Sequence, residues 1–418
     1  EIDVDALEEP LGDVAEQLSD LLGWIGVPPS DAVPPPLGSE TTLDTRWEPG
    51  EGTAFTADVP SGLYGNYWWG KADNVYDYEQ GRWRTDPAGS QLVVEAEGEL
   101  QPSDEATAGG SNRVQATITI GDSSFARANL FRPPEAVSSA THDLRARVTP
   151  GRGVSDLEYL APLEEGTAVS VLAFVRDYRP GSEELTGNAL RATADLAYPA
   201  WVEEHYLDGR DDPVVVGPLT QATAERISGE TGTTPYDWAV QVQAELRDMT
   251  YNTDIDGRCD EYSGVFTECL LAIREGFCQQ YATTMVMLMR AMDVPARFVT
   301  GYLPGDVDEE GRLRVEQAAL HNWAEVYFPD FGWIRFDPTP GLRFGQQSTS
   351  LLDGEPLRPE PSPSPEPEPG EEPLEPEEPI DEVIVPPEPS EPPAGGGVSV
   401  AMFVSLGALA GILVAVVS

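Results

Sequence analysis

The sequence predicts an α+β protein in which a β-rich domain precedes a domain of mixed helices and strands. Three observations lead to this prediction. Runs such as QLVVEAEGEL and TAVSVLAFVRDY in the first half of the chain partly alternate apolar and polar residues, as strands do. After about residue 212, segments with apolar residues at helical spacing are mixed with strand-like runs. The chain then ends in a proline-rich acidic stretch and an uncharged apolar one.

Composition limits the partners of the protein. Its 418 residues can form two or three domains with substantial cores. Asp and Glu number 73 against 25 Lys and Arg, the net charge is −48, and Lys71 is the only lysine. Nucleic acid is therefore not an expected partner. Salt screens the repulsion within such an acidic surface, which indicates a saline environment, as in halophilic archaea. An acidic protein from a GC-rich genome is the alternative.

The first segment, residues 1–40, is predicted to be an amphipathic helix followed by a proline-rich connector. Apolar residues recur on one side of a helix over residues 4–26, and the prolines that begin at Pro28 end it. The chain begins with Glu1 and shows no signal peptide, so we expect it to be a segment of a longer protein.

Residues 41–211 are predicted to form the β-rich domain, with a sandwich as the simplest arrangement. Short strand-like runs there are separated by Gly, Pro, Asp and Ser. An aromatic cluster at residues 64–83 could form a sugar-binding face, but Tyr and Trp on strands more often pack in the core, which is the favoured interpretation.

Residues 212–346 are predicted to form an α+β domain. A helix is expected over 235–251, with Thr234 as its N-cap and Pro235 in its first turn. A second helix is expected to begin at Cys278 and to bury one apolar face. Strands over 321–328 and 333–337 are expected to form a hairpin. The apolar face of the helix that begins at Cys278 consists of Tyr281, Met285, Leu288, Met289 and Met292.

The C-terminal part is predicted to be a spacer and a membrane anchor. Residues 347–394 are rich in Pro and Glu, which favours an extended segment that does not pack. A transmembrane helix is predicted over 395–418, because residues 398–418 carry no charge and would rise about 31 Å as a helix. We expect the protein to lie at the cell membrane with its folded part outside the cytoplasm.

Three cysteines raise the question of a disulfide and of a reactive thiol. A bridge between Cys259 and Cys269 would leave Cys278 free, but two unpaired core cysteines are an equal alternative. At the start of a helix, the unpaired N–H groups and the helix dipole stabilise a thiolate. Cys278 is therefore either a nucleophile or a small buried core residue.

A base and an orienting carboxylate for Cys278 can be found in the predicted hairpin. Antiparallel pairing of its strands would bring His321 near Asp337, although a slip of one residue would exchange faces. Cys278, His321 and Asp337 are then the nucleophile, base and carboxylate that cysteine catalysis needs. Taken singly, His321 could be an ordinary strand residue, and Asp337, which precedes Pro338, could be a turn former.

The motifs GFCQQYATTMVMLMRAMDVPARFVTGYLPG and HNWAEVYFPDFGWIRFDPTP resemble the transglutaminase-like superfamily, particularly its membrane-anchored prokaryotic branch. The resemblance covers about residues 235–341 and implies a papain-like or transglutaminase-like catalytic domain. It assigns the nucleophile to Cys278, the base to His321 and the orienting carboxylate to Asp337. Asn322 departs from the pattern, since the family more often has a small residue after the histidine.

The resemblance implies acyl transfer from a protein or peptide substrate through a thioester on cysteine. A cysteine peptidase or amidase of the same fold is one alternative, and a non-catalytic surface-binding scaffold is another. The backbone N–H of Cys278 is the candidate for one oxyanion donor, while the sequence assigns no second donor. No cofactor and no metal are expected, because His321 and the cysteines lack paired ligand spacing. The acidic run 306–311 is interpreted as a solvated turn rather than a weak Ca²⁺ site.

Overall fold

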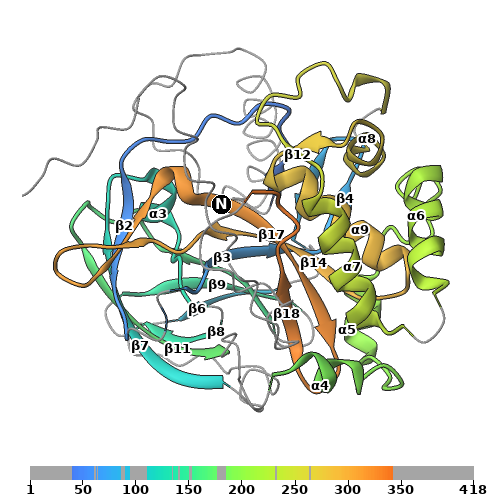
Figure 1. The fold of residues 1–418 in the computed structure, drawn as a ribbon. Coiled ribbons are helices and arrows are strands. Elements are labelled where there is room, and N and C mark those ends of the chain that lie inside the picture. Colours follow the sequence, from blue (N-terminus) through green and yellow to red (C-terminus); the bar gives the residue numbers. More distant parts are fainter. Residues whose placement is uncertain are drawn as a thin grey trace, which may run out of the picture. The chain divides into compact units, whose positions relative to one another are not determined.

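Two large antiparallel sheets and a group of helices make up the described part of the chain (Figure 1). The computed structural model describes residues 40–341, except for 61–62, 64, 86–89, 95–110, 134, 140–141, 150–152, 177–184, 231–232 and 263–264. The predicted helix over 4–26, the spacer 347–394 and the predicted membrane helix over 395–418 lie outside these residues. Among the described residues, no helix combines the length and apolarity that crossing a membrane requires.

The larger sheet has seven strands and carries the hairpin that sequence patterns predict. Its order is β18-β17-β14-β3-β10-β9-β6, and all of its pairings are antiparallel. The strands are β3 (Trp68–Asp73), β6 (Ser90–Val94), β9 (Leu144–Thr149), β10 (Gly153–Tyr159), β14 (Ala296–Tyr302), β17 (Leu320–Phe328) and β18 (Gly332–Phe336).

The second large sheet has six strands in the order β15-β16-β2-β7-β11-β8. In both sheets a strand from the first half of the chain pairs with one from the second half, β3 with β14 and β2 with β16. The segments 41–211 and 212–346 therefore share both large sheets. The six strands are β2 (Thr53–Asp58), β7 (Ser111–Ile120), β8 (Glu135–Ser139), β11 (Ala168–Arg176), β15 (Asp306–Val307) and β16 (Leu313–Glu316).

Two small sheets complete the strand pairing among the described residues. One has the order β1-β5-β4, and the other is the parallel pair β12-β13. The first holds the chain around residue 40 beside the rest of the fold, and the second immediately precedes Cys278. Their strands are β1 (Glu40–Thr42), β4 (Val75–Asp77), β5 (Arg82–Arg84), β12 (Thr250–Tyr251) and β13 (Glu275–Gly276).

Helices α6, α7 and α9 lie on one side of the molecule in Figure 1, and strands β2, β7 and β11 lie on the other, with β3, β14 and β17 between them. The capping box of Thr234 and Asp237 and the N-terminal Pro235 explain why α7 begins where the sequence predicts. The helix ends at Arg247, before the predicted end at 251. The helical elements are α3 (Ser124–Ala128), α4 (Gly187–Arg191), α5 (Ala200–Tyr206), α6 (Pro218–Ser228), α7 (Pro235–Arg247), α8 (Phe266–Ile273), α9 (Cys278–Ala291), η3 (Asp260–Tyr262) and η4 (Gln317–Ala319).

Helix α9 is buried on nearly all sides, rather than on the single predicted face. It packs against α6, α7, α8 and the strands β14 and β17, which leaves little of it in contact with solvent. Even Arg290 is fully buried, and its guanidinium donates hydrogen bonds to the carbonyls of Asn74, Asp208 and Ala296. Burial lowers the pKa of Arg290 to about 10. The helix that begins at Cys278 is thus anchored along its whole length.

The aromatic residues of the 64–83 cluster that the structure describes pack mainly in the core. Trp68, Trp69, Tyr76 and Trp83 are all at least 94% buried. The indole of Trp83 also donates a 2.9 Å hydrogen bond to the Thr283 hydroxyl of α9. Core packing, the favoured interpretation, therefore accounts for these rings.

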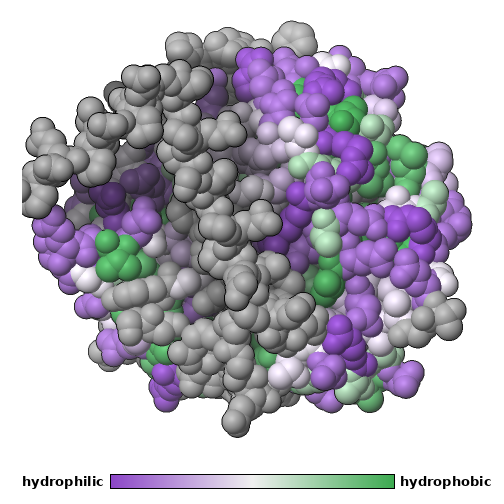
Figure 2. All heavy atoms as spheres, viewed as in Figure 1, coloured by the Kyte–Doolittle hydropathy of each residue, from purple (hydrophilic) through white to green (hydrophobic). Residues whose placement is uncertain are grey.

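The coloured residues of the visible face in Figure 2 are mainly hydrophilic, with small hydrophobic areas between them. The acidic run 306–311 begins with the two residues of β15, and its remaining residues form an ion-paired turn before β16. Its Asp308 accepts hydrogen bonds from the backbone and the guanidinium of Arg312. These contacts agree with the interpretation of this run as a turn.

Candidate active site

Cys278 is the first residue of α9 and is 3% exposed. The chain enters the helix from β13, whose pairing with β12 fixes the approach. The preceding Phe277 is fully buried, and its N–H donates to the side-chain oxygen of Gln280 at 3.0 Å. The first-turn N–H groups of a helix have no partner within the helix, so the thiol lies at the positive end of the helix dipole.

A disulfide joins Cys259 and Cys269, with 5.5 Å between their Cα atoms. Cys278 is the free cysteine, and it is the third of the three in the chain. Of the two alternatives that the sequence leaves open, the structure has the bridged one. The bond ties the start of η3 to α8, which packs on α9.

His321 and Asp337 lie together beside the hairpin of β17 and β18. The distance between His321 Nε2 and Asp337 Oδ2 is 2.8 Å, and both residues are 3% exposed. The ladder pairs Ala324 with Phe336, an offset of two residues from direct pairing of His321 with Asp337. An offset of two residues leaves His321 and Asp337 on the same face of the sheet. They are therefore close together, as expected, although the register differs.

The Asp337 carboxylate is held by further contacts that sequence patterns do not reveal. Its Oδ2 accepts a 2.8 Å hydrogen bond from the Tyr67 hydroxyl, and its Oδ1 accepts one of 3.0 Å from the Thr339 N–H. The backbone of Asp337 is fixed as well, because its N–H donates to Gln243 and its carbonyl accepts from Arg247. Gln243 and Arg247 lie on α7, so this helix positions the carboxylate.

The electrostatics favour a charged imidazole. Burial lowers the pKa of His321, but the Asp337 carboxylate and the Cys278 side chain raise it to about 10. Burial raises the pKa of Asp337, but His321 and Arg247 lower it, and the net result lies below its ordinary value. Because Nε2 contacts Asp337, Nδ1 is the ring nitrogen that this carboxylate leaves available.

Aromatic packing fixes the plane of the His321 ring. Trp323 stacks on it with centroids 6.5 Å apart, and Tyr67 meets it edge-on at 6.2 Å. The residue that pairs with His321 on β14 is Gly301. A Cβ atom at Gly301 would lie 2.5 Å from the indole of Trp323 and 2.1 Å from the carbonyl oxygen of Trp68. Glycine at this position leaves room for the indole that supports the histidine.

Asn322, the departure from the family pattern, contacts the thiol directly. Its Oδ1 accepts from Cys278 Sγ at 3.7 Å. Its Nδ2 donates to the Thr300 hydroxyl at 2.9 Å and to the carbonyl of Val299 at 3.4 Å. Successive residues of a strand point to opposite faces. At the start of β17, however, both residues act with Cys278: Asn322 Oδ1 contacts its sulfur, and the Cys278 side chain raises the pKa of His321.

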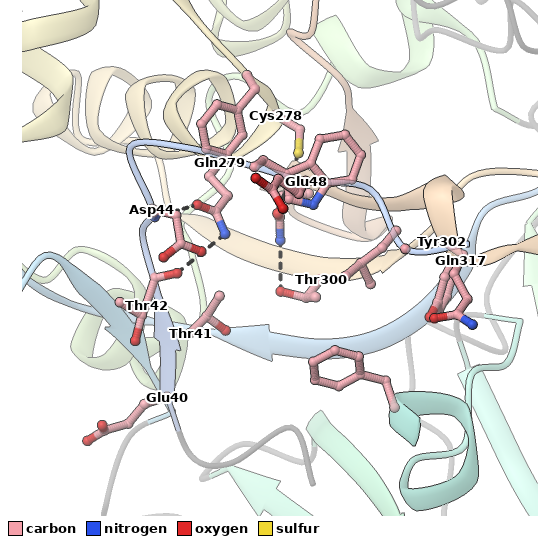
Figure 3. Close-up of a pocket in the computed structure, with 16 residues that line it drawn as sticks. Glu40, Thr41, Thr42, Asp44, Glu48, Cys278, Gln279, Thr300, Tyr302 and Gln317 are labelled. Carbon is pink, nitrogen blue, oxygen red and sulfur yellow. Dashed lines mark hydrogen bonds between the residues drawn. The ribbon is translucent and has the colours of Figure 1, made fainter. Parts of the chain in front are cut away.

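A cleft of about 500 Å³ opens beside Cys278 (Figure 3). One wall is the segment 40–50, which the sequence assigns to the edge of the β-rich domain. Gln279 binds this wall, accepting from the Asp44 N–H at 2.8 Å and donating to the Thr42 carbonyl at 3.3 Å. Gln280 donates to the Asp44 carbonyl at 2.7 Å. The two glutamines after the cysteine thus fasten the wall to the start of α9.

The cleft has a strongly acidic lining. Glu40, Asp44 and Glu48 contribute carboxylates, and the described residues that line the cleft include no Lys, Arg or His. Figure 3 shows Cys278 and Thr300 on the same cleft as these three acidic residues. Such a lining favours a positively charged group near the thiol.

A free thiol at a helix start, beside a histidine that is paired with an aspartate, is an arrangement of nucleophilic cysteine enzymes. Residues 221–338 match the family model of the transglutaminase-like superfamily. Residues 221–338 of the chain are therefore a transglutaminase-like domain.

Three relatives illustrate the extent of the similarity. The uncharacterized protein YebA of Bacillus subtilis is 36% identical over 106 residues, which cover 24% of this chain and 14% of YebA. A protein-glutamine gamma-glutamyltransferase of Pseudomonas aeruginosa is 42% identical over 71 residues, which cover 17% of this chain and 11% of that protein. An uncharacterized protein of Mycobacterium bovis is 36% identical over 96 residues, or 22% of this chain and 29% of the relative.

Among solved structures, the periplasmic domain of TgpA from Pseudomonas aeruginosa is similar, with a TM-score of 0.49 and 19% identity. The comparison covers 71% of this chain and 94% of that domain. The matches to the curated relatives span less than a third of each relative's length.

Proposed function

We propose that the protein is a transglutaminase-like acyltransferase, in which Cys278 is the nucleophile, His321 the acid and base, and Asp337 the orienting carboxylate. The observation that carries this proposal is the buried 2.8 Å contact between His321 and Asp337, together with the electrostatic effect of Cys278 on the same imidazole. These three residues are separated in the sequence, and both Cys278 and Asp337 act on the His321 imidazole.

In the first step, the thiol proton of Cys278 passes to His321 Nδ1, and the raised pKa of His321 favours the resulting pair of thiolate and imidazolium. The sulfur attacks the carbonyl carbon of a substrate amide, and the carbonyl electrons move to the oxygen. Asp337 holds the ring through Nε2 and stabilises its positive charge. The first-turn backbone N–H of Cys278 is available to the oxyanion.

In the second step, the tetrahedral intermediate collapses. The carbonyl re-forms, the carbon–nitrogen bond breaks, and His321 transfers its proton to the departing ammonia or amine. The acyl group remains on sulfur as a thioester. The high pKa of His321 keeps the proton available at neutral pH.

In the third step, an amine or water attacks the thioester. His321 takes a proton from the attacking nucleophile, and the sulfur leaves as a thiolate beside the resulting imidazolium, which restores the starting pair. An amine gives a new amide and water gives a carboxylic acid, so cross-linking and hydrolysis are two outcomes of one thioester.

The chemistry of the cleft supports an amine as the acceptor and a glutamine side chain as the acyl donor. The acidic lining attracts an ammonium group, which must lose a proton before it attacks. The similar protein of Pseudomonas aeruginosa is a protein-glutamine gamma-glutamyltransferase, which supports a glutamine carboxamide as the reacting amide.

We also propose that the domain acts outside the cytoplasm and is held at a membrane by residues 398–418. The disulfide of Cys259 and Cys269 supports an oxidising compartment. The 21 uncharged residues at the end of the chain are long enough to cross a bilayer as a helix, at about 1.5 Å per residue.

Mass spectrometry tests the proposed reaction. The 418-residue chain is incubated with a glutamine-containing peptide, with and without a primary amine. We expect amine incorporation with loss of ammonia, and none with Cys278→Ala. Deamidation or peptide cleavage alone would indicate a hydrolase. No reaction, with Cys278 alkylated no faster than an exposed peptide thiol, would support a binding scaffold and contradict the proposal.

A further inference from the structure

The Asn322 carboxamide contacts Cys278 Sγ on one side and the Thr300 hydroxyl on the other. It is 5% exposed, lines the cleft, and its Oδ1 lies 3.7 Å from Cys278 Sγ. His321, by contrast, is not among the residues that line the cleft. An acyl group that approaches Cys278 through the cleft therefore meets Asn322 before it meets the imidazole.

The Thr300 hydroxyl, which accepts a hydrogen bond from Asn322, can also act as the donor to it. Thr300, also a lining residue, accepts from Nδ2 through its hydroxyl at 2.9 Å. A hydroxyl can donate as readily as it accepts. If the Asn322 carboxamide rotates by about 180° around its Cβ–Cγ bond, Oδ1 and Nδ2 exchange positions. Thr300 can then donate to Oδ1, and Nδ2 faces the Cys278 sulfur. This rotation gives up the 3.4 Å hydrogen bond to the Val299 carbonyl, and it replaces the contact of Oδ1 with Cys278 Sγ by one of Nδ2 with the same sulfur.

The transfer of the thiol proton from Cys278 to His321 favours this rotation of the carboxamide. While Cys278 is a thiol, its S–H needs an acceptor, and Oδ1 is in place to accept. Once His321 has taken the proton, an oxygen beside the negative sulfur is repulsive, and an N–H is attractive. The same N–H then lies beside the position where negative charge develops on the acyl oxygen.

Thr300 belongs to a row of buried polar residues on the same face of the sheet. The register pairs Asn322 with Thr300, Thr300 with Lys71, and Lys71 with Asp156. The side chains of paired residues lie on one face. Lys71 is fully buried and forms a 3.0 Å ion pair with Asp73. Asn322 and Thr300, the two members of this row that line the cleft, give it preorganised polar groups, which an oxyanion site requires.

We propose that the Asn322 carboxamide is the second donor to the oxyanion, beside the backbone N–H of Cys278, with Thr300 as the hydroxyl that permits it to turn. This inference rests on the proposed function and adds a catalytic residue to it. The step breaks no covalent bond, since the carboxamide only rotates and exchanges hydrogen-bond partners.

The experiment compares two reactions of the one free thiol. Acylation by p-nitrophenyl acetate passes through an oxyanion, and its burst of p-nitrophenolate gives the acylation rate without need of the natural substrate. Alkylation by iodoacetamide involves no oxyanion and reports the reactivity of the sulfur alone. With Cys259 and Cys269 bridged, Cys278 is the only cysteine left to react, and Cys278→Ala is the blank.

We expect Asn322→Ala to slow acylation by about 100-fold and to change alkylation by less than about threefold. Asn322→Asp, which keeps the shape but offers no N–H, should be at least as slow in acylation. Thr300→Val removes the hydroxyl at constant shape and should slow acylation by about tenfold. Thr300→Ser, which keeps the hydroxyl, should recover most of that loss.

Three results would overturn the inference. One is an Asn322→Ala variant whose acylation rate equals that of the wild type. Another is an equal loss of acylation and alkylation, which would mean that Asn322 only positions the thiol. The third is a Thr300→Val variant no slower than Thr300→Ser. If the wild-type chain itself gives no burst and its thiol alkylates slowly, the proposed function fails instead, so the two failures are distinguishable.

Discussion

The Tyr67 hydroxyl donates a 2.8 Å hydrogen bond to the Asp337 carboxylate across 270 residues of sequence. Both groups are buried, and the oxygen that accepts from Tyr67 also faces His321 Nε2. Tyr67 directly precedes β3, a strand of the first half of the chain. The N-terminal half thus contributes a positioning residue to the candidate site. Burial and the Asp337 charge raise the pKa of this phenol well above its ordinary value, so it stays a donor.

Tyr67→Phe should slow acylation of Cys278 by about tenfold, because Asp337 loses one of the donors that orient its carboxylate. The phenyl ring keeps the aromatic contacts with His321 and Trp323. The free energy of unfolding should fall by about 1 kcal/mol. Burst kinetics and urea unfolding measure the two effects. Wild-type values in both would show that Tyr67 fills space and does not position Asp337.

The raised pKa of His321 predicts that its proton is retained through neutral pH. Its pKa is about 10 in the folded protein, against the ordinary value of 6.5. The contribution of this residue to stability is fully present below pH 6.5 and is lost as the pH rises to about 10. The ¹⁵N shifts of the His321 imidazole should therefore report an imidazolium at pH 8. In the Asp337→Asn variant, the same imidazole should lose its proton at a lower pH. Titration of the wild-type ring near pH 6.5 would contradict this prediction.

The protein should be unable to cross-link itself through lysine. Lys71 is the only lysine of the chain, and its side chain is fully buried against Asp73. A glutamine-peptide donor should therefore label no lysine of the wild-type chain. Arg46→Lys should become labelled, because the Arg46 side chain is 55% exposed and its neighbours Asp44 and Trp47 line the cleft. Peptide mapping measures the label, and Arg46→Lys combined with Cys278→Ala is the control. Labelling of Lys71 in the wild type would contradict the buried placement.

The disulfide should stabilise the fold without taking part in the reaction. Cys259 and Cys269 are 10 residues apart, and closing a loop of this size contributes about 2–3 kcal/mol. Cys259→Ser combined with Cys269→Ser should lower the free energy of unfolding by this amount while the acylation rate at 25 °C changes little. Urea unfolding and burst kinetics test this. Loss of the burst in a fully folded double variant would show that the bridge positions α9.

Local patterns predicted the parts of the site that lie within one element. The helix that begins at Cys278 and the capped start of α7 depend on residues close in sequence. The hairpin with His321 and Asp337 was predictable from its two strands and turn, although the true register differs by two residues. An even offset does not change which face a side chain occupies, so the proximity was insensitive to this difference.

Long-range contacts could not be predicted from these patterns. Tyr67 reaches Asp337 only because β3 pairs with β14, and no periodicity specifies which strands become neighbours. The same holds for the cleft wall, where Asp44 meets Gln279 across 235 residues. Asn322 was visible in the sequence as a departure from the family pattern, but its contact with the thiol needed the fold. The saline environment inferred from the net charge stays a prediction.

Rapid-quench mass spectrometry of the chain mixed with a glutamine-containing peptide tests the central claim most directly. A thioester intermediate predicts an acyl adduct on the peptide that contains Cys278, with ammonia released and the adduct removed by hydroxylamine. The adduct should be absent with Cys278→Ala and strongly reduced with His321→Ala. Product formation at wild-type rate without any adduct on Cys278, or an adduct whose rate is unchanged in His321→Ala, would contradict the account.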